Sequence, residues 1–330
     1  MQAKLLKTDI HQFRFLIEKE LEGIYFDLAP KELYDPIRYT LSPGGKKTRS
    51  VLLLMACQMF KGSFEEALPA AVAVELFHNF SLVHDDIMDA ASLRRNKMTI
   101  HEKWDKNTAI LSGDSMLVKS FQMLGKCNPV ILPRILALFS EAALKVCEGQ
   151  QLDMIYESND KITIEEYLHM IELKTSALLA VSLELGALTG GASDENADYL
   201  RRFGNHLGIA FQLQDDILDV YGVQERIGKK LGGDILAGKK TFLLVMAMEL
   251  ANPLTLDKLH TILNDDSIPS TEKIKEIKHI YDIYKVKEAA KNEIFHHHSQ
   301  GMKWLDKINV SENRKNGLKA LSENLMNRDL

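Results

Sequence analysis

Two clusters of aspartates stand out in this sequence as residues whose types and spacing favour chemistry. The first reads Asp85-Asp86-Ile87-Met88-Asp89, and the second reads Asp215-Asp216-Ile217-Leu218-Asp219. On a helix, the outer aspartates of each cluster are four residues apart and share one face. Carboxylates this close repel one another unless a cation lies between them. All-oxygen ligands suit Mg²⁺, which binds through a few carboxylates and the phosphates of a substrate. The clusters therefore predict a magnesium site for a phosphorylated substrate.

A solvated acidic patch is the competing interpretation of either cluster taken alone. Two copies with nearly the same spelling, each inside an otherwise apolar helical segment, count against it. Helices that face one another in a bundle can hold such carboxylates in the core.

Basic residues that could bind phosphate accompany both clusters. Residues 44–49 form a Gly-Gly turn that opens a helix, and the spacing places Lys46 and Arg49 on one face near its N-terminus, which favours an anion. Arg94 and Arg95 follow the first cluster. A glycine-rich segment after the second cluster could close on phosphates as a lid, and its lysines are Lys229, Lys230, Lys239 and Lys240. Lys174 lies within an apolar helix, where it needs a partner.

The elements that must position these residues have helical period almost everywhere. Val72, Leu76, Phe80, Val83 and Ile87 recur every three or four residues and form one apolar stripe. No stretch alternates like a strand. The breaks between segments are too short for interdomain linkers. We therefore expect an all-α protein, with residues 1–330 forming one domain of about ten or more helices.

Composition excludes several classes of protein. The chain has 330 residues, of which 45% are hydrophobic, and its net charge is -5, which argues against a nucleic-acid partner. Its three cysteines (Cys57, Cys127 and Cys147) cannot build a disulfide framework. No apolar run is long enough to span a membrane. We expect a cytoplasmic protein.

At this point the pattern resembles the trans-isoprenyl diphosphate synthase (polyprenyl synthetase) family. The first cluster with Arg94 and Arg95 is similar to the family's DDxxD motif followed by RR, and Phe211-Gln212 with the second cluster is similar to its FQxxDDxxD motif. Further matches, in the family's order, are Gly44, Gly45, Lys46 and Arg49; Glu75, His78, Ser81, Leu82 and His84; Gly113-Asp114; Gly149-Gln150; Lys174-Thr175; Lys229; and Lys239-Lys240-Thr241.

The resemblance implies an isoprenoid synthase-like bundle around a deep central cavity, usually in a homodimer. It also implies a reaction. An allylic diphosphate (dimethylallyl, geranyl or farnesyl) ionises, its carbocation is attacked by isopentenyl diphosphate, and loss of a proton gives the trans product. Cations on the leaving diphosphate would stabilise the developing charge, and a dry cavity would keep water from the carbocation.

The resemblance also implies roles for individual residues. Asp85, Asp89 and Asp215 would hold three Mg²⁺ on the allylic diphosphate, with Asp86 and Asp219 completing that shell and Asp216 completing the second motif. The other residues expected at the allylic diphosphate are Arg94, Lys174, Lys229 and Lys239. Those expected at isopentenyl diphosphate are Lys46, Arg49, His78 and Arg95. Thr175 and Gln212 would stabilise the cation.

Histidines invite two further interpretations. His78 could be an ordinary core histidine, but it lies seven residues before Asp85, two turns along the same helix face, which favours the site. The run His296-His297-His298 invites a metal site, but adjacent positions do not converge, so we expect these residues on the surface.

Residues just before the first cluster would form the floor of the product cavity in this family. They are Phe77, Phe80 and Ser81, which lie eight, five and four residues before Asp85. Along a helix, five to eight residues rise roughly 7–12 Å, which would make the cavity shallow. One aromatic beside the small Ser81 is typical of a short-chain enzyme that makes a C15 or C20 product. Ordinary core packing is the alternative for both phenylalanines.

Three other functions were weighed. A terpene cyclase would share the fold, but its second motif is usually of an Asn/Ser/Glu type, unlike the aspartates here. A non-catalytic subunit that binds prenyl diphosphates tends to lose aspartates, and here all six remain. A metal phosphohydrolase using His84 and Asp85 would need further histidine ligands, which the sequence does not place suitably.

Overall fold

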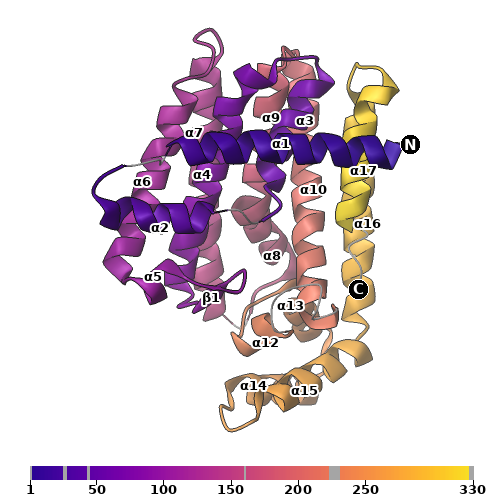
Figure 1. Ribbon diagram of the computed structural model, residues 1–330. Helices are drawn as coiled ribbons and strands as arrows, with labels where there is room; N and C mark the ends of the chain where they lie inside the picture. The colour runs from indigo at the N-terminus through magenta and orange to yellow at the C-terminus, as the bar shows by residue number, and fades with distance from the viewer. Residues whose placement is uncertain (1, 25–27, 43–44, 160, 223–230, 327–330) are drawn as a thin grey trace. The chain divides into compact units, whose positions relative to one another are not determined.

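A computed structural model shows a chain built almost entirely of helices, as the sequence predicts (Figure 1). It describes residues 2–24, 28–42, 45–159, 161–222 and 231–326, with side chains from Ile10 onward. The expected absence of strands is wrong at one place, where β1 (Leu93–Arg94) pairs antiparallel with β2 (Lys97–Met98). The reason is the two-residue turn between them: Arg95 and Asn96 have φ angles of 53° and 61°, the left-handed pair that closes a tight hairpin.

The chain divides into two compact units. The first comprises Met1–Leu144, Leu178–Gly204 and Lys303–Leu321, and the second comprises Lys145–Ala177, Asn205–Met302 and Ser322–Leu330. Each unit draws on several separate stretches of the chain. That residues 1–330 act as one domain stays a prediction.

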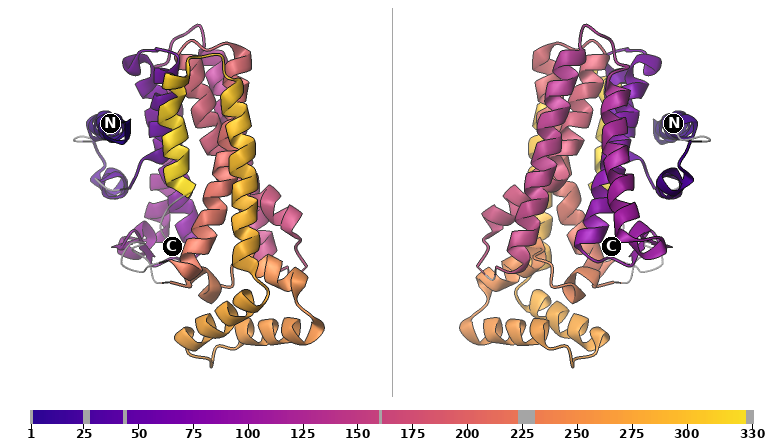
Figure 2. Two further views of the ribbon diagram at one scale, coloured as in Figure 1. Left: turned by 90° about the vertical axis from the view of Figure 1, so that its right-hand side faces the viewer. Right: turned by 90° about the vertical axis from the view of Figure 1, so that its left-hand side faces the viewer.

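The first unit is a set of helices packed around α4. Its own elements, besides β1 and β2, are α1 (Gln2–Ile24), α2 (Lys31–Leu41), α3 (Thr48–Met59), α4 (Phe64–Met88), α5 (Ile100–Lys103) and α6 (Lys106–Leu124). α4 packs against α3 and α6, while α1 crosses α3 and α4 (Figure 1). Figure 2 shows α1 and α2 outside the α3, α4 and α6 helices. This arrangement leaves α4 enclosed by other helices.

The second unit continues from helices that it shares with the first. The elements that contribute residues to both units are α7 (Leu132–Glu157), α9 (Ala177–Thr189), α10 (Asp194–Tyr221), α16 (Val286–Lys307) and α17 (Glu312–Met326). Its own elements are α8 (Ile164–Ile171), the π-helix η1 (Glu172–Ser176), α12 (Gly233–Leu236), α13 (Phe242–Leu250), α14 (Pro253–Asn264) and α15 (Ser270–Ile283). No helix among the described residues is both long and apolar enough to cross a membrane.

Local sequence signals account for where the helices begin. Ser63 caps α4, because its side chain accepts a hydrogen bond from the Glu65 N–H. Thr163 and Glu166 form a capping box at the start of α8. Inside α4, residues from Ala70 to Phe77 are almost all buried, so this helix is held by packing on several sides. The helix that carries the first aspartate cluster is therefore part of the core.

Close helix packing in the first unit depends on Gly186 of α9. A Cβ atom at this position would lie 2.1 Å from the backbone oxygen of Leu53 in α3. Backbone cannot move aside as a flexible side chain can, so any larger residue must push the two helices apart.

A pair of buried histidines joins α10 and α16 in the second unit. The Nδ1 atoms of His206 and His297 lie 3.0 Å apart, and His297 Nε2 lies 3.2 Å from a carboxylate oxygen of Glu293. Burial, the largest cause, lowers the pKa of each histidine to about 4. The expected surface position is correct for His296 but wrong for His297, whose side chain is only 12% exposed because the partner helix covers it.

We expect Gly186→Ala to lower the free energy of unfolding by roughly 2 kcal/mol, because the new methyl group overpacks the α3–α9 contact. Denaturant unfolding would measure this. Gly23→Ala on α1 is the matched control, since nothing lies within 4 Å of a Cβ there, and it should be neutral or slightly stabilising. Equal effects of the two substitutions would contradict the packing argument.

The histidine pair should make stability depend on pH. Both pKa values lie below the usual value of about 6.5, so the unfolded chain takes up more protons as the pH falls. The pair therefore stabilises the protein fully above about pH 6.5, and this contribution is lost as the pH falls toward 4. We expect His297→Gln to destabilise the protein more at pH 7.5 than at pH 5, as measured by unfolding at both pH values. His279→Gln, at an exposed position of α15, is the control. A difference from wild type that stays constant with pH for His297→Gln would refute the proposed linkage.

Candidate active site

The first aspartate cluster lies at the C-terminal end of α4. Asp89 caps the helix, and its N–H donates to the Asp85 carbonyl at 2.9 Å, so the two aspartates are one helical turn apart as predicted. This end of a helix carries a partial negative charge, which makes it an unfavourable place for carboxylates. A positive charge is needed to offset the repulsion.

Arg94 supplies that charge in the structure. The β1–β2 hairpin turns the chain back, so that Arg94 Nη2 donates to Asp85 Oδ2 at 3.0 Å and Arg94 Nε donates to Asp86 Oδ1 at 2.5 Å. Burial raises the pKa of Asp86 to about 6, an effect that Arg94 partly offsets. Arg94, predicted to bind the allylic diphosphate, thus contacts the predicted metal ligands directly.

Four cations surround His78 on α4. Arg49 Nη1 donates to His78 Nε2 at 3.2 Å, which leaves the proton of the neutral ring on Nδ1. Burial lowers the pKa of His78 strongly, and Arg49, Arg95, Arg94 and Lys47 lower it further. His78 is therefore a neutral side chain among cations. The positive field of these cations favours the binding of an anion.

The turn before α3 brings the other predicted cations to this region. Gly45 has a φ of 81°, a left-handed conformation that favours glycine, and a Cβ there would lie 2.8 Å from the Nη1 atom of Arg95. The prediction that Lys46 and Arg49 share a helix face is wrong, because Lys47 adopts a left-handed conformation with φ of 48° and α3 begins only at Thr48. Lys46 is exposed and lies before the helix. Gly44 lies outside the described residues.

The second aspartate cluster lies near the C-terminal end of α10, in the second unit. Asp216 is 2% exposed and accepts three hydrogen bonds, from the Tyr167 hydroxyl at 2.6 Å, the Gln212 amide at 3.0 Å and the Phe242 N–H at 3.0 Å. Burial raises the pKa of Asp216 to about 7 despite these donors. Asp216 therefore ties α8, α10 and α13 together.

Asp215 and Asp219 lie on the more accessible side of α10, and both are half-buried. The Asp219 carboxylate accepts from the Asp234 N–H at 3.1 Å, and its carbonyl accepts from the Gly232 N–H at 2.7 Å. Asp219 thus holds the described part of the glycine-rich segment against the end of α10.

Lys174 and Thr175 lie in η1, not in the continuous α-helix expected from the sequence. A π-helical turn places side chains differently from an α-helix and often occurs at functional sites. Lys174 Nζ donates to Asp153 Oδ2 at 2.6 Å, which is the partner that a lysine in apolar surroundings needs. Gly149 on α7 allows η1 to pack this closely, because a Cβ at position 149 would lie 2.2 Å from the backbone nitrogen of Lys174.

The predicted cation-stabilising residues lie together. Thr175 Oγ1 donates to Gln212 Oε1 at 3.0 Å, and Gln212 in turn donates to Asp216. Lys239 is half-buried, and its N–H donates to the Asp234 carbonyl at 3.0 Å. Lys229 lies outside the described residues.

The predicted floor residues form an aromatic cluster in the first unit. The Phe77 ring is 5.4 Å from the rings of both Phe80 and Phe139, and Phe80 is 4.7 Å from the His84 ring. Phe77 is 1% exposed and Phe80 is 9% exposed. The Ser81 hydroxyl donates back to the His78 carbonyl at 2.9 Å. The cluster continues the first aspartate motif deeper along α4.

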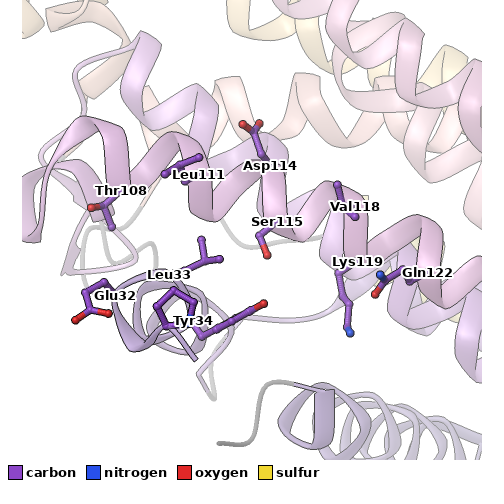
Figure 3. A pocket seen from close by; sticks show the side chains of 11 residues that line it. Glu32, Leu33, Tyr34, Thr108, Leu111, Asp114, Ser115, Val118, Lys119 and Gln122 are labelled. Carbon is purple, nitrogen blue, oxygen red and sulfur yellow. The ribbon is translucent and has the colours of Figure 1, made fainter. Parts of the chain in front are cut away.

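A hollow of about 530 Å³ lies between α2 and α6 (Figure 3). Leu33 and Tyr34 line it from α2, while Leu111, Ser115 and Val118 line it from α6. Asp114, from the Gly113-Asp114 match, also lines it, but none of the residues predicted to bind metal or substrate does. We therefore do not assign this hollow to the reaction.

The donors at both clusters suit Mg²⁺, because they are carboxylate oxygens. In the part of the chain that the structure describes, no three histidine, cysteine or acidic side chains converge into a ready-made metal cage. Mg²⁺ binds through one or two carboxylates and takes its remaining ligands from water and substrate phosphates. The half-buried carboxylates of Asp85 and Asp89 in the first unit, and that of Asp215 in the second, are each the type of ligand that fits this ion without a closed cage.

Sequence reasoning missed several residues of these networks. Asp153 accepts a hydrogen bond from Lys174, and Tyr167 donates one to Asp216. Phe139 packs against the ring of Phe77. Asp153 had one available signal, an aspartate one turn after the Gly149-Gln150 pair. Tyr167 and Phe139 had none, since aromatic residues are common in apolar helices.

Comparison with known proteins agrees with these observations. The family model for polyprenyl synthetase matches residues 30–284. The geranylgeranyl diphosphate synthase of Methanosarcina mazei is 44% identical over 222 residues, which cover 67% of this chain and 68% of that protein. A crystal structure of geranylgeranyl pyrophosphate synthetase from Pyrococcus horikoshii has a TM-score of 0.93 at 31% identity and covers 100% of both chains.

A third comparison concerns ligands. A crystal structure of geranylgeranyl pyrophosphate synthase from Corynebacterium glutamicum, complexed with isoprenyl diphosphate and magnesium, has a TM-score of 0.85 at 27% identity and covers 99% of both chains. The family model spans well over half of this sequence. The chain therefore belongs to the polyprenyl synthetase family, and it is a short-chain trans-prenyltransferase.

Proposed function

We propose that this protein condenses an allylic diphosphate with isopentenyl diphosphate and releases geranylgeranyl diphosphate, the C20 product. The observation that carries the proposal is the arrangement at α4, where half-buried carboxylates adjoin a cluster of cations around neutral His78. Carboxylates suit the metal ions on one diphosphate, and the cations suit a second diphosphate. A terpene cyclase needs no second diphosphate, and no observation favours that alternative.

Each group has a role in this reaction. The C–O bond of the allylic diphosphate breaks, its electron pair leaves with the diphosphate, and a C–C bond forms from the double bond of isopentenyl diphosphate. Mg²⁺, when bound, supplies positive charge at the leaving diphosphate. Asp85, Asp89 and Asp215 would hold three such ions. Lys174, Lys229, Lys239 and Arg94 would bind the same diphosphate. The released diphosphate takes the proton that is lost.

Thr175 of η1 and Gln212 of α10 act on the carbocation. The Thr175 hydroxyl and the Gln212 amide present oxygen dipoles, and their hydrogen bonds to one another and to Asp216 hold these dipoles in place. Dipoles that are fixed beforehand stabilise a developing charge without reorganising. Lys46, Arg49, His78 and Arg95 bind isopentenyl diphosphate.

The homodimer implied by the resemblance remains part of this proposal. α6 and α7 expose apolar residues that a second copy of the chain would cover, among them Leu111 (60%), Val118 (58%) and Leu144 (61%). The cytoplasmic location also remains a prediction.

The C20 assignment combines two observations. The relatives compared above act as geranylgeranyl diphosphate synthases by name. In addition, Phe80 and Phe77 are large and buried beneath the first cluster, while Ser81 is small. A floor made by one or two aromatics stops growth of the product at a short length.

We expect Asp85→Asn and Asp215→Asn each to lower turnover by roughly two orders of magnitude or more, because each removes a charged ligand for the ions at the leaving group. Turnover is measured with labelled isopentenyl diphosphate and farnesyl diphosphate, and circular dichroism confirms folding. Asp257→Asn, at an exposed position of α14, is the control. Near-wild-type turnover of either variant would refute the proposed metal site.

Phe80→Ala, alone or with Phe77→Ala, should shift the products toward longer chains, because it removes the floor of the cavity. Chromatographic sizing of the products measures this shift independently of the fraction of active protein. Phe15→Ala, at a position of α1 that is 63% exposed, is the control. An unchanged product profile for the double variant would exclude these residues as the floor.

A further inference from the structure

We propose that Glu75 and Lys47 form a buried positioning pair that holds the turn before α3, so that Lys46 and Arg49 can bind isopentenyl diphosphate. This inference rests on the proposed function. Lys47 is one of the cations near His78, but neither Lys47 nor Glu75 is assigned a contact with a substrate in the reaction described above.

The pair joins the start of α3 to the middle of α4. Lys47 Nζ lies 3.3 Å from Glu75 Oε1, and the two side chains are 1% and 2% exposed. The Ser50 hydroxyl donates to Glu75 Oε2 at 3.0 Å, and the Asn79 amide donates to Glu75 Oε1 at 3.1 Å. Glu75 is thus a fully enclosed carboxylate with a cation and two hydrogen-bond donors.

Stability alone does not explain such a pair. Removing two charges from water carries a large desolvation cost, and apolar residues of similar volume are often as stable. Among the described residues, Lys47 Nζ also makes no hydrogen bond, so Glu75 contacts it through charge alone. A costly buried pair that specifies one geometry indicates a role in positioning.

The backbone at Lys47 shows what is positioned. Lys47 is the N-cap of α3, has no side-chain capping bond, and adopts a left-handed φ of 48°. This conformation is strained for a residue other than glycine, so it needs support from its surroundings. The Lys47 carbonyl accepts the first helical hydrogen bond, from the Val51 N–H at 2.9 Å. Anchoring Lys47 therefore sets where α3 begins.

The anchored turn lies between the residues that matter for binding. Lys46 precedes Lys47, and Arg49 follows it within the first turn of α3. Glu75 and His78 are neighbours on α4, three residues apart, and His78 accepts from Arg49 at 3.2 Å. The contacts that connect the start of α3 to α4 thus include the buried Lys47–Glu75 ion pair, the Ser50–Glu75 hydrogen bond and the Arg49–His78 hydrogen bond.

Loss of the pair should weaken the binding of isopentenyl diphosphate more than that of the allylic diphosphate. If the turn shifts, Lys46 and Arg49 lose their geometry, and misplacement by about 1 Å can cost a large factor in rate. Lys174 and Asp215, which are expected at the allylic diphosphate, lie on η1 and α10, and the contacts named above anchor the turn to α4.

The test compares Glu75→Gln with a double variant, Lys47→Met with Glu75→Gln. KM is measured separately for isopentenyl diphosphate and for farnesyl diphosphate, and unfolding is measured for every protein. We expect both variants to raise the KM for isopentenyl diphosphate roughly tenfold or more, with the KM for farnesyl diphosphate changed less than about threefold. Glu66→Gln, at an exposed position of α4, is the control and should match wild type.

Each other outcome overturns the inference. A purely structural role would lower kcat and the amount of folded protein with both KM values unchanged. Glu75→Gln leaves a buried ammonium unpaired and can fail to fold, so the double variant, which buries no charge, then decides. Its recovery of the wild-type KM for isopentenyl diphosphate would refute the positioning pair. If wild-type protein makes no product from the two diphosphates, the proposed function fails and the pair fails with it; if wild type is active, only the pair is at stake.

Discussion

Negative charges concentrated at helix ends are the constraint on which the rest of this structure depends. Both aspartate clusters occupy the last turns of long helices, where the helix dipole adds to their mutual repulsion. Each cluster is stabilised differently. Arg94 bridges Asp85 and Asp86, whereas Asp216 is surrounded by hydrogen-bond donors. The outer aspartates of each cluster (Asp85, Asp89, Asp215 and Asp219) are more accessible than the buried Asp86 and Asp216. Their accessibility suits carboxylates that bind a metal ion which also contacts a diphosphate.

The clustered cations near His78 are also stabilised by the groups packed around them. Cations gather around His78, and burial together with those cations keeps its ring neutral. Gly45 lets the Arg95 guanidinium approach the turn before α3, and Gly149 lets Lys174 approach α7 and meet Asp153. Glycine at these points allows backbone and charged side chains to come within contact distance. Charge placement in this protein therefore depends on packing as much as on the charged residues themselves.

The sequence predicted the helical class and most of the candidate site because both have periodic signals. The spacing of Asp85 and Asp89 defines a shared helix face, and the structure confirms the helical turn between them. The prediction for Lys46 and Arg49 failed because a left-handed residue, Lys47, interrupts the helix that periodicity alone extends. The β1–β2 hairpin was missed because two residues per strand are too few to alternate visibly. The π-helix at Lys174 was missed because its apolar pattern is the same as that of an α-helix.

By itself, the sequence determined which residues are charged, the helical class of the chain, and the shared helix face of the outer aspartates in each cluster. Those properties depend on residue type and local spacing. The tertiary structure alone decided that Arg94 pairs with the first cluster, that Lys174 pairs with Asp153, and that Glu75 meets Lys47 in the core. These partners are far apart in the chain or joined by a turn, so their contact depends on how the helices pack. Packing depends on the volume and shape of side chains from many segments, which a local sequence pattern does not specify.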